Sequence, residues 1–568
     1  MRKKLLSNSS ALKQVISSAN VPHALTMRSF HVNLNNSDGA NTTAAATTST
    51  SSTTTAIPSA CPYHQKQQAS DVPPPKPFSE IPGPKGWPLI GNLPLLYKNS
   101  KNNIGPFFMD LLDTYGQTVK LDILGKKIIL LSNPDDMEKL YKNEEKRTQS
   151  EGSRFYKMEK GVRLAPMEMR YEENWNDIRQ IYNIAMKPDF HETVTLPHLS
   201  ELNSEFVKRL MRYLEPGEGD KYRLTNAVDA ISKYGFDAVM KVFLGVKMTD
   251  ELTATFPFKI RDFVDQSVKS LDIIGKLMQN PPIYKYYKTP LYKQLEESYD
   301  KSFEYARYVM NRFKSNPSDK PRFYEFLMER SKDDPNPDAI VESVMISFLQ
   351  AGIDITMRIL CITAFRLAHH PEYQEKIYKE LLDTFGEPTL EEAISENGLQ
   401  VTKEQYKKLK FTKQFLDEVL RLNPFSYIVS AREMSKDLEI GGYIMPKDSL
   451  VMTVQQHPSL KDEYIPRALE FIPERWEKGS PYAPTNSFIS APFGVGARKC
   501  PGSRIATTEI HFAIINFVRH FKLSHANPEK FPDMSFDQAL LYINLDKNAL
   551  YFTPRDHLKD HCKSVQRK

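Results

Sequence analysis

The chain has 568 residues, of which 76 are Lys or Arg and 70 are Asp or Glu, so its formal net charge is +6. With 40% hydrophobic residues and a mean hydropathy of -0.49, the composition excludes both a polytopic membrane protein and a wholly disordered chain, and it predicts a large core. The four cysteines are too few and too scattered for a disulfide framework, which indicates a reducing compartment or a cysteine kept for chemistry.

The basic charge is concentrated at the start of the chain. Residues 1–37 contain five basic residues and no acidic one, together with many serines and with apolar residues at roughly helical spacing. This composition is typical of an organellar transit peptide, which we favour over a disordered basic tail. Without this leader 71 basic residues face 70 acidic ones, so the charge indicates import rather than contact with nucleic acid.

We interpret residues 38–77 as a low-complexity linker. The run NTTAAATTSTSSTTTA over 41–56 cannot bury enough apolar surface to order itself. Nowhere does the chain offer the roughly 18 uninterrupted apolar residues that a membrane span needs. Ordered structure is therefore expected to begin near Phe78.

The next part of the chain reads as a hairpin followed mostly by helix. Two β-rich runs joined at Gly125 predict a hairpin over 116–133, with a helix after Pro134. From about 175 to 380 the pattern is mainly helical and includes a long apolar segment over 339–368. Because Asp354 and Arg358 lie inside that segment, we interpret it as a core helix with a functional interruption rather than a membrane span.

A second hairpin is predicted towards the C-terminal end. It covers 437–454 and turns at Gly441 and Gly442. No internal repeat is visible, so the expected fold class is mainly α with small β-sheets, in a single large domain over 78–555. Residues 556–568 are interpreted as a polar tail.

Cys500 has a setting suited to chemistry. It lies in APFGVGARKCPGSRIA, which contains the pattern Phe-x-x-Gly-x-Arg-x-Cys-x-Gly. Glycines before a cysteine let the backbone fold so that its N–H groups can point at the sulfur. A helix beginning near Pro501 would place its positive end beside the same sulfur and lower the pKa of the thiol. The pattern therefore predicts a metal-binding thiolate.

Several motifs in a fixed order resemble the cytochrome P-450 family of haem-thiolate enzymes. Besides the cysteine pattern, these are Trp-x-x-x-Arg at Trp175 and Arg179, Glu-x-x-Arg at Glu418 and Arg421, and FIPERW at 471–476. The resemblance covers about residues 80 to 555. It implies a single cytochrome P-450-type haem domain in which Cys500 binds the iron of haem b.

The resemblance also assigns other residues around the haem. The positions that match cofactor-binding residues of the family are Phe493, Arg498, Trp175, Arg179 and Arg432. Of these, the tryptophan and the arginines would bind the haem propionates. A buried network of Glu418 with Arg421 and Arg475 is expected to support the loop that holds the thiolate.

The long apolar segment is where the match to the family fails. The family carries Ala-Gly-x-Asp-Thr-Thr there, whose acid and first Thr deliver protons for dioxygen activation, but this chain has AGIDIT at 351–356, with Ile355 at the first Thr position. Helical spacing puts Phe348, Ala351 and Ile355 on the face towards the haem, and Thr356 about 100° further round. The catalytic candidates are Asp354, as a proton carrier through water, and Thr356.

Three functions stay open. We favour a monooxygenase that hydroxylates a lipophilic substrate with O2, because the acid and the Ala-Gly pair are present. The alternatives are a haem-thiolate isomerase that rearranges a peroxide without activating O2, and a non-catalytic haem-binding sensor. A sterol-like compound, another isoprenoid or a xenobiotic would bind among apolar residues of 152–166 and 256–277.

Other features resemble the mitochondrial branch of the family: the leader, the lack of a membrane anchor, the PERW sequence and KYYKTPLYKQL at 285–295. This resemblance implies the matrix side of the inner mitochondrial membrane, is compatible with peripheral membrane association, and implies no nucleic acid partner. Electrons would come from a ferredoxin with its NADPH-dependent reductase. The ferredoxin would dock on a basic face with Lys413 and Arg504, although Asp417 occupies a second docking position.

Overall fold

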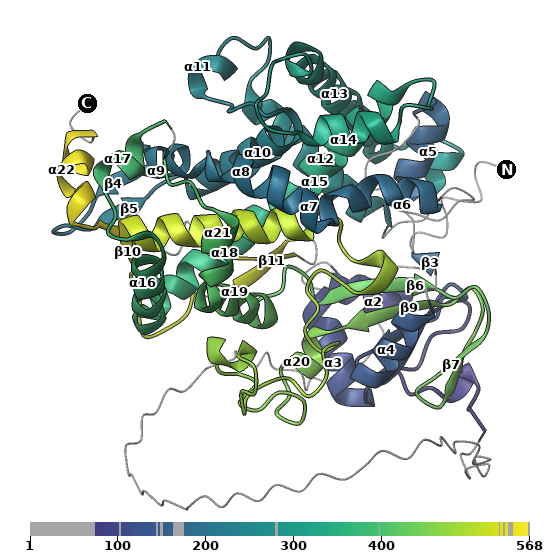
Figure 1. Ribbon diagram of the computed structural model, residues 1–568. Coiled ribbons are helices and arrows are strands. Elements are labelled where there is room, and N and C mark those ends of the chain that lie inside the picture. Colours follow the sequence, from purple (N-terminus) through teal and green to yellow (C-terminus); the bar gives the residue numbers. More distant parts are fainter. Residues whose placement is uncertain are drawn as a thin grey trace, which may run out of the picture. The chain divides into compact units, whose positions relative to one another are not determined.

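The computed structural model describes residues 74–100, 104–143, 146–147, 151–162, 175–278, 282–396, 398–532, 534–537, 540–543 and 549–565. The predicted transit peptide, and the predicted linker up to residue 73, lie outside these residues and stay predictions. From Pro75 onward the chain forms one compact unit. This unit is mainly helical with small sheets, as the sequence predicts (Figure 1).

Helices make up most of the described chain. Their bounds are α2 Leu93–Ser100, α3 Ile104–Tyr115, α4 Pro134–Lys142, α5 Glu151–Lys160, α6 Trp175–Asn183, α7 Pro188–Phe190, α8 Leu196–Ser200, α9 Asn203–Arg212, α10 Ala227–Leu244, α11 Asp250–Thr253, α12 Ile260–Met278, α13 Pro290–Phe313, α14 Phe323–Arg330, α15 Pro337–His369, α16 Pro371–Phe385, α17 Leu390–Ile394, α18 Lys403–Lys408, α19 Lys410–Leu422, α20 Gln456–Ser459, α21 Ser503–His520 and α22 Asp556–Val565. Short 3-10 turns are η1 Phe78–Glu80, η2 Ile184–Met186, η4 Ile283–Lys285, η5 Pro473–Trp476 and η6 Gly496–Arg498, and η3 His191–Thr195 is a π-helical turn.

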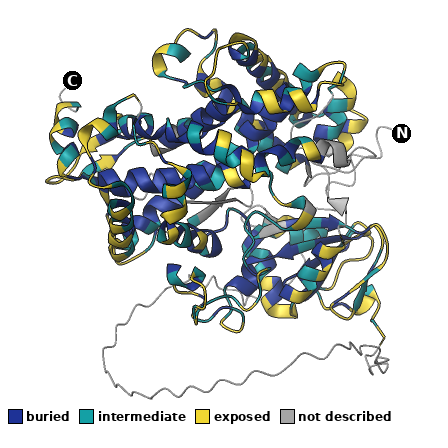
Figure 2. Ribbon diagram, in the orientation of Figure 1, coloured by how far each residue is buried: buried dark blue, intermediate teal, exposed yellow. Residues whose placement is uncertain are grey.

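The helix α15 runs through the core and packs against α10, α12 and α21. Asn336 caps its start by accepting a hydrogen bond from Ala339 N at 3.3 Å, and Pro337 occupies the first turn. Within the described residues it alone is long and apolar enough to cross a membrane, and 72% of its most apolar window is buried. Most of its residues are buried and none is exposed (Figure 2), so it is a core helix, as predicted.

The functional interruption expected in α15 is wrong. Every residue from Ala351 to Thr356 is helical. Ile355 has no hydroxyl group that could compete for main-chain carbonyls, so its side chain offers the helix no local alternative to its own hydrogen bonds. Any path for water past this segment must therefore depend on what packs beside the helix.

The strands of the described residues form four small sheets. They are β1 Thr118–Ile123, β2 Lys126–Leu131, β3 Lys146–Arg147, β4 Leu214–Pro216, β5 Tyr222–Leu224, β6 Ile428–Glu433, β7 Leu438–Ile440, β8 Tyr443–Met445, β9 Leu450–Val454, β10 Phe521–His525, β11 Met534–Asp537, β12 Leu540–Ile543 and β13 Leu550–Pro554. The largest sheet has the order β1-β2-β9-β6-β3 and the next β10-β13-β5-β4, while β11 pairs with β12 and β7 with β8. The pair β2–β9 is parallel and the other pairs are antiparallel.

Both predicted hairpins are present, with one change. Leu124 and Gly125 have φ values of 55° and 84°, which suits the two-residue turn between β1 and β2. The second hairpin, β7–β8, turns at Gly441 and Gly442, but β9 leaves it and inserts between β2 and β6. The pattern of apolar residues cannot distinguish these partners, because both pairings alternate with the same period.

Two parts of the chain differ from their predicted roles. A hairpin, β4–β5, interrupts the region predicted as mainly helical, and it is completed by pairing with β13, more than 300 residues later. The polar tail predicted for 556–568 is wrong over Asp556–Val565, because α22 buries Leu558 and Cys562 against the body of the protein. At the other end, Lys76 already bridges to Tyr443.

Candidate functional site

Cys500 closes a tight loop that leads into α21. Its N–H donates to the carbonyl of Phe493 at 2.7 Å, and Gly494 and Gly496 have φ values of 70° and 66°, which favour glycine. The cysteine is half-buried, and a Cβ built on Gly502 would lie 3.9 Å from its Sγ. Because α21 begins at Ser503, the sulfur lies near the positive end of that helix.

Arg179 of α6 reaches this loop from more than 300 residues earlier. Its side chain is buried, and Nη2 donates to the carbonyl of Lys499, which precedes Cys500, and to Met186 Sδ at 3.5 Å. Trp175 begins the same helix, but its side chain lies outside the described residues. Of the Trp-x-x-x-Arg pair, the structure therefore places the arginine beside the cysteine loop.

Arg432 of β6 is also buried, and Arg498 of η6 is half-buried. The Arg432 guanidinium lies 5.9 Å from the ring centroid of Tyr141, whose carbonyl oxygen is 4.0 Å from the position of a Cβ built on Gly496. Arg432 donates to the neutral carbonyl of Ala431 at 3.1 Å. Because buried guanidinium groups are stabilised best by anions, these arginines together with the Cys500 thiol suit a ligand with a metal atom and carboxylates.

The predicted Glu418–Arg421–Arg475 network is present and fully buried. Arg421 binds Glu418 in bidentate fashion at 2.8 and 2.7 Å, and Arg475 Nε binds the same carboxylate at 2.9 Å. Trp476 Nε1 and the N–H of Ile472 also donate to it, at 3.1 and 2.9 Å. The role of Trp476 in this network is not predicted from the sequence, although the PERW motif that contains it is a signal for it.

The remaining donors of the two arginines bind main-chain carbonyls. Arg421 Nη1 donates to Ser459 and Ala468 at 2.8 and 2.7 Å, and Arg475 Nη1 donates to Tyr482 at 2.7 Å. The network thus ties α19 to the irregular segment that precedes the cysteine loop.

The candidates on α15 lie on different faces. Ala351, Gly352 and Ile355 are half-buried, as are Met357 and Arg358, whereas Thr356 is 3% exposed. Asp354 is 6% exposed, and its Oδ2 accepts a hydrogen bond from Arg358 Nε at 3.0 Å. Ala351 and Ile355 belong to the face that is predicted to lie towards the haem. Thr356 lies on another face of the helix.

Phe348 differs from the other residues predicted on that face. Its ring is buried in an aromatic cluster with Tyr182, Phe243 and Phe323, at centroid distances of 6.0, 5.5 and 5.6 Å. The ring also borders the cysteine loop, because its Cε1 is 3.6 Å from the position of a Cβ on Gly502. Phe348 therefore packs helices together at the edge of the site.

The two segments predicted to line a substrate pocket come together in part. A Cβ on Gly152 of α5 would lie 3.0 Å from Leu277 Cδ1 of α12, so the two helices are in close contact. Residues 163–166 of the first segment lie outside the described residues.

Comparison with known proteins decides the family. The model of the family "Cytochrome P450" matches residues 81–549. The chain belongs to the cytochrome P450 family. It is 26% identical to "Cytochrome P450 10" of Lymnaea stagnalis over 80% of this chain and 83% of that protein. It is 27% identical to "Probable cytochrome P450 12b2, mitochondrial" of Drosophila melanogaster over 79% and 84%, and 24% identical to "Cytochrome P450 3A16" of Mus musculus over 84% and 92%.

As a cytochrome P450, the protein is an oxidoreductase of the monooxygenase class, and the family implies a haem iron with a cysteine thiolate ligand. Among the cysteines that the structure describes, Cys500 fits this role. Cys361 and Cys562 are buried in helices, and burial raises the pKa of each thiol to about 12.

The predicted docking residues of this cytochrome P450 are not equivalent. Lys413 is half-buried, donates to the carbonyl of Tyr406 at 2.7 Å and lies 4.3 Å from the centroid of its ring. Desolvation lowers the pKa of Lys413. Arg504 is exposed, although its Nε donates to Met186 O at 2.6 Å. The structure therefore leaves Arg504 exposed and ties Lys413 to Tyr406.

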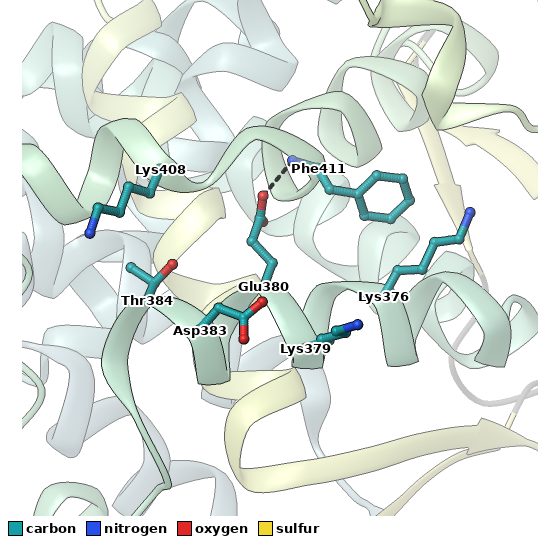
Figure 3. Close-up of a pocket in the computed structure, with 7 residues that line it drawn as sticks. All are labelled: Lys376, Lys379, Glu380, Asp383, Thr384, Lys408 and Phe411. Carbon is teal, nitrogen blue, oxygen red and sulfur yellow. Dashed lines mark hydrogen bonds between the residues drawn. The ribbon is translucent and has the colours of Figure 1, made fainter.

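Exposed lysines surround the junction of α16, α18 and α19. Lys408 lines a cavity of about 410 Å³ with Lys376, Lys379 and Phe411 (Figure 3). Glu380 lies between these lysines, but its carboxylate caps α19 by accepting hydrogen bonds from Phe411 N at 2.7 Å and Thr412 N at 3.0 Å. Cys500 does not line this cavity, and Lys376, Lys379 and Lys408 are exposed.

Proposed function

We propose that this cytochrome P450 hydroxylates a lipophilic substrate with O2, and that Cys500 binds the iron of haem b. The observation that carries the proposal is the buried guanidinium of Arg179 beside the half-buried Cys500 loop. Arg498, Arg179, Arg432 and Trp175 would hold the propionates, and Phe493 would lie next to the sulfur. When bound, the haem supplies the redox chemistry that activates O2. The residues of this chain hold it, exclude water and deliver protons.

Asp354 is the proton carrier that we propose for this chain. Its carboxylate is kept in place by Arg358, one helical turn later, and it follows the half-buried Ala351 and Gly352. Thr356 is the weaker candidate, because it is buried on another face of α15. Proton delivery would therefore run from Asp354 through ordered water, since Ile355 offers no hydroxyl group.

The same Ile355 favours a second candidate function, a haem-thiolate isomerase that rearranges a peroxide without activating O2. A half-buried apolar side chain stands where the family carries a hydroxyl group. Ile355 is also compatible with a third candidate function, a non-catalytic haem-binding sensor. The three differ in what they require and release, so one reconstitution separates them.

The test combines the full chain with a ferredoxin, its NADPH-dependent reductase, and sterols, other isoprenoids and xenobiotics under 18O2. We expect a product that carries one 18O atom and depends on NADPH, detected by mass spectrometry. An unlabelled product formed without any electron donor would establish the isomerase. Spectral binding of a compound with no product in either condition would favour the sensor.

We propose that the ferredoxin docks on the exposed lysines at the end of α18 rather than on Lys413. Lys407, Lys408 and Lys410 are exposed, and no ion pair recorded among the described residues involves them. Arg504 adds a further exposed cation next to the cysteine loop. Because residues 38–568 are nearly neutral, such a local excess of positive charge suits an acidic partner.

We propose the matrix side of the inner mitochondrial membrane as the location. The acid-free leader supports import, and several relatives are named mitochondrial. Ile283, Tyr286 and Tyr287, between α12 and α13, are 56%, 93% and 71% exposed, which supports peripheral contact with a membrane. Fractionation of a full-length tagged protein, followed by flotation with vesicles of inner-membrane composition, tests both statements. A cytosolic protein that does not float would contradict them.

A further inference from the structure

The exposed face of α19 carries one acid among basic and neutral residues. Lys410 and Asp417 are exposed, and Lys413 and Gln414 are half-buried, so these four residues share one face of the helix. Glu418, the other acid of α19, is completely buried. Every residue of α19 is described, and Asp417 is the only acid that this helix presents to solvent.

Asp417 lies among the groups that surround Tyr406, where α18, α19 and α21 meet. The carbonyl of Tyr406 accepts a hydrogen bond from Lys413 at 2.7 Å, and its hydroxyl oxygen lies 2.8 Å from His511 Nδ1. Burial is the main cause that raises the pKa of Tyr406 to about 12, with Arg504 acting in the opposite direction and Asp417 in the same one. Asp417 and the exposed Arg504 therefore both lie near this ring.

The carboxylate of Asp417 has no cation of its own. Among the described residues no ion pair involves Asp417. The cation that acts on it is Lys413, whose ammonium group donates to Tyr406 O and lies 4.3 Å from the centroid of that ring. Although Asp417 is exposed, desolvation of its carboxyl raises the pKa to about 6, so the group is an anion at a pH of about 7.5.

Other exposed acids of this surface have exposed lysines beside them. Asp383 of α16 lines the cavity of about 410 Å³ together with Lys379 and Lys408. Glu404 of α18 lies one turn before Lys408, at the i,i+4 spacing of an ion pair. The neighbours of Asp417 on the exposed face of α19 are instead a glutamine and a lysine that is already engaged. A negative charge thus interrupts a surface that is otherwise suited to acidic partners.

We propose that Asp417 selects the electron donor by pairing with a basic side chain that the donor carries within its acidic face. This inference rests on the ferredoxin docking proposed above. Acids of the donor pair with the exposed lysines at the end of α18, and an acid placed opposite Asp417 is repelled. Such a mixed pattern of charge fixes the orientation of the donor and excludes carriers that lack the complementary cation. Asp417 determines the specificity for the partner and takes no part in the reaction itself.

The test measures binding rather than turnover. The probe is a ferredoxin of known structure whose docking face carries only acidic charged side chains, and each of these acids is changed singly to Lys. Fluorescence titration of the full-length, haem-loaded protein at low salt gives each Kd. Most of the changes should weaken binding to the unmodified protein. One should strengthen it by about fivefold or more, because the new lysine meets Asp417.

Asp417→Lys should reverse this pattern. It should bind the unchanged acidic probe about fivefold or more tightly than the unmodified protein does, and it should lose the gain from the lysine-bearing probe. Glu404→Lys makes the same change of charge on α18 and is the matched control. This control should tighten the binding of every probe by a similar factor and preserve the gain. An unaltered reduced CO-difference spectrum of Asp417→Lys shows that the adjacent Glu418 network is intact.

The inference is overturned if every acid-to-lysine change weakens binding to the unmodified protein, or if the gain persists in Asp417→Lys. Equal binding of the acidic probe to the unmodified protein and to the triple variant Lys407→Glu, Lys408→Glu and Lys410→Glu would refute the proposed docking site, and the inference with it. A reconstituted enzyme that forms no hydroxylated product would refute the proposed reaction alone, because no titration depends on turnover.

Discussion

The buried network around Glu418 and the core helix α15 differ in how completely their buried charged groups are paired. Around Glu418, two arginines, an indole and a main-chain N–H all bind one carboxylate that is completely buried. Around α15, Asp354 has a single arginine within its own helix, and Glu509 Oε1 of the neighbouring helix α21 has no hydrogen-bond partner. The first region satisfies every buried polar group, and the second does not.

The difference follows from what each region must do. A fully satisfied network is rigid, because breaking any one bond leaves a buried charge uncompensated. Such rigidity suits a loop that holds a metal ligand in one geometry. A proton path needs groups that can change their partners, so incomplete hydrogen bonding beside α15 is consistent with proton transfer.

The largest effect is expected at the cysteine itself. Cys500→Ser should abolish the thiolate signature in the reduced CO-difference spectrum and reduce turnover by more than about 100-fold, because the sulfur ligand is lost. Cys361→Ser, a change at a buried thiol within α15, should retain both. A thiolate spectrum in Cys500→Ser would mean that another cysteine binds the iron.

Removing one member of the satisfied network should cost stability. Glu418→Gln leaves two buried arginines without their carboxylate and should lower the free energy of unfolding by about 3–5 kcal/mol. In the exposed pair Lys142–Glu138, the matched change Glu138→Gln should cost less than about 1 kcal/mol. Urea unfolding of all three proteins measures both values, and equal costs would remove the contrast between the two regions.

On the α15 side the expected loss is in rate rather than in stability. Asp354→Asn should reduce turnover by about tenfold or more, because the amide cannot pass a proton. The unfolding midpoint should change little, since the amide oxygen still accepts a hydrogen bond from Arg358. Asp338→Asn, at the start of the same helix, is the control, and it should leave turnover unchanged. Unchanged turnover in Asp354→Asn would assign proton delivery to other groups.

A smaller effect is expected for the electron donor. Replacing Lys407, Lys408 and Lys410 by Glu should raise the KM for ferredoxin by about fivefold to 50-fold at low salt, and the loss should shrink at high salt. Lys293→Glu on α13, which lies away from α18 and α19 in Figure 1, is the control. If Lys413→Glu raises the KM for ferredoxin more than the triple variant does, the ferredoxin docks at Lys413 instead.

The smallest effect is expected at His511 on α21. Burial lowers the pKa of His511 to about 3, and its Nδ1 lies 2.8 Å from Tyr406 Oη. Below the ordinary histidine pKa of about 6.5, the unfolded chain binds a proton that the folded chain does not, so stability falls as the pH falls. When the pH falls from 6.5 to 5.5, the free energy of unfolding measured in urea should fall by about 1 kcal/mol less in His511→Asn than in the unmodified protein. Parallel curves would contradict this.

The residues predicted best are those whose role depends on local spacing. The loop around Cys500, the turn at Gly125 and the Glu418–Arg421 pair are each set by residues a few positions apart. Arg475 was also predicted, because its motif is specific. The interruption of α15, predicted from Asp354 and Arg358, is wrong, because these two charges form an i,i+4 ion pair within a continuous helix.

The sequence by itself determined the class of the protein, because the motifs that surround a haem thiolate are short and ordered along the chain. Only the tertiary structure decided which charges find partners. In the folded protein Lys413 donates to the carbonyl of Tyr406, and β9 pairs with β2 and β6. The helix α22 is packed against the body of the protein, and Glu509 Oε1 has no hydrogen-bond partner. Burial and pairing depend on residues hundreds of positions apart, and a pattern of neighbouring residues carries no information about those distances.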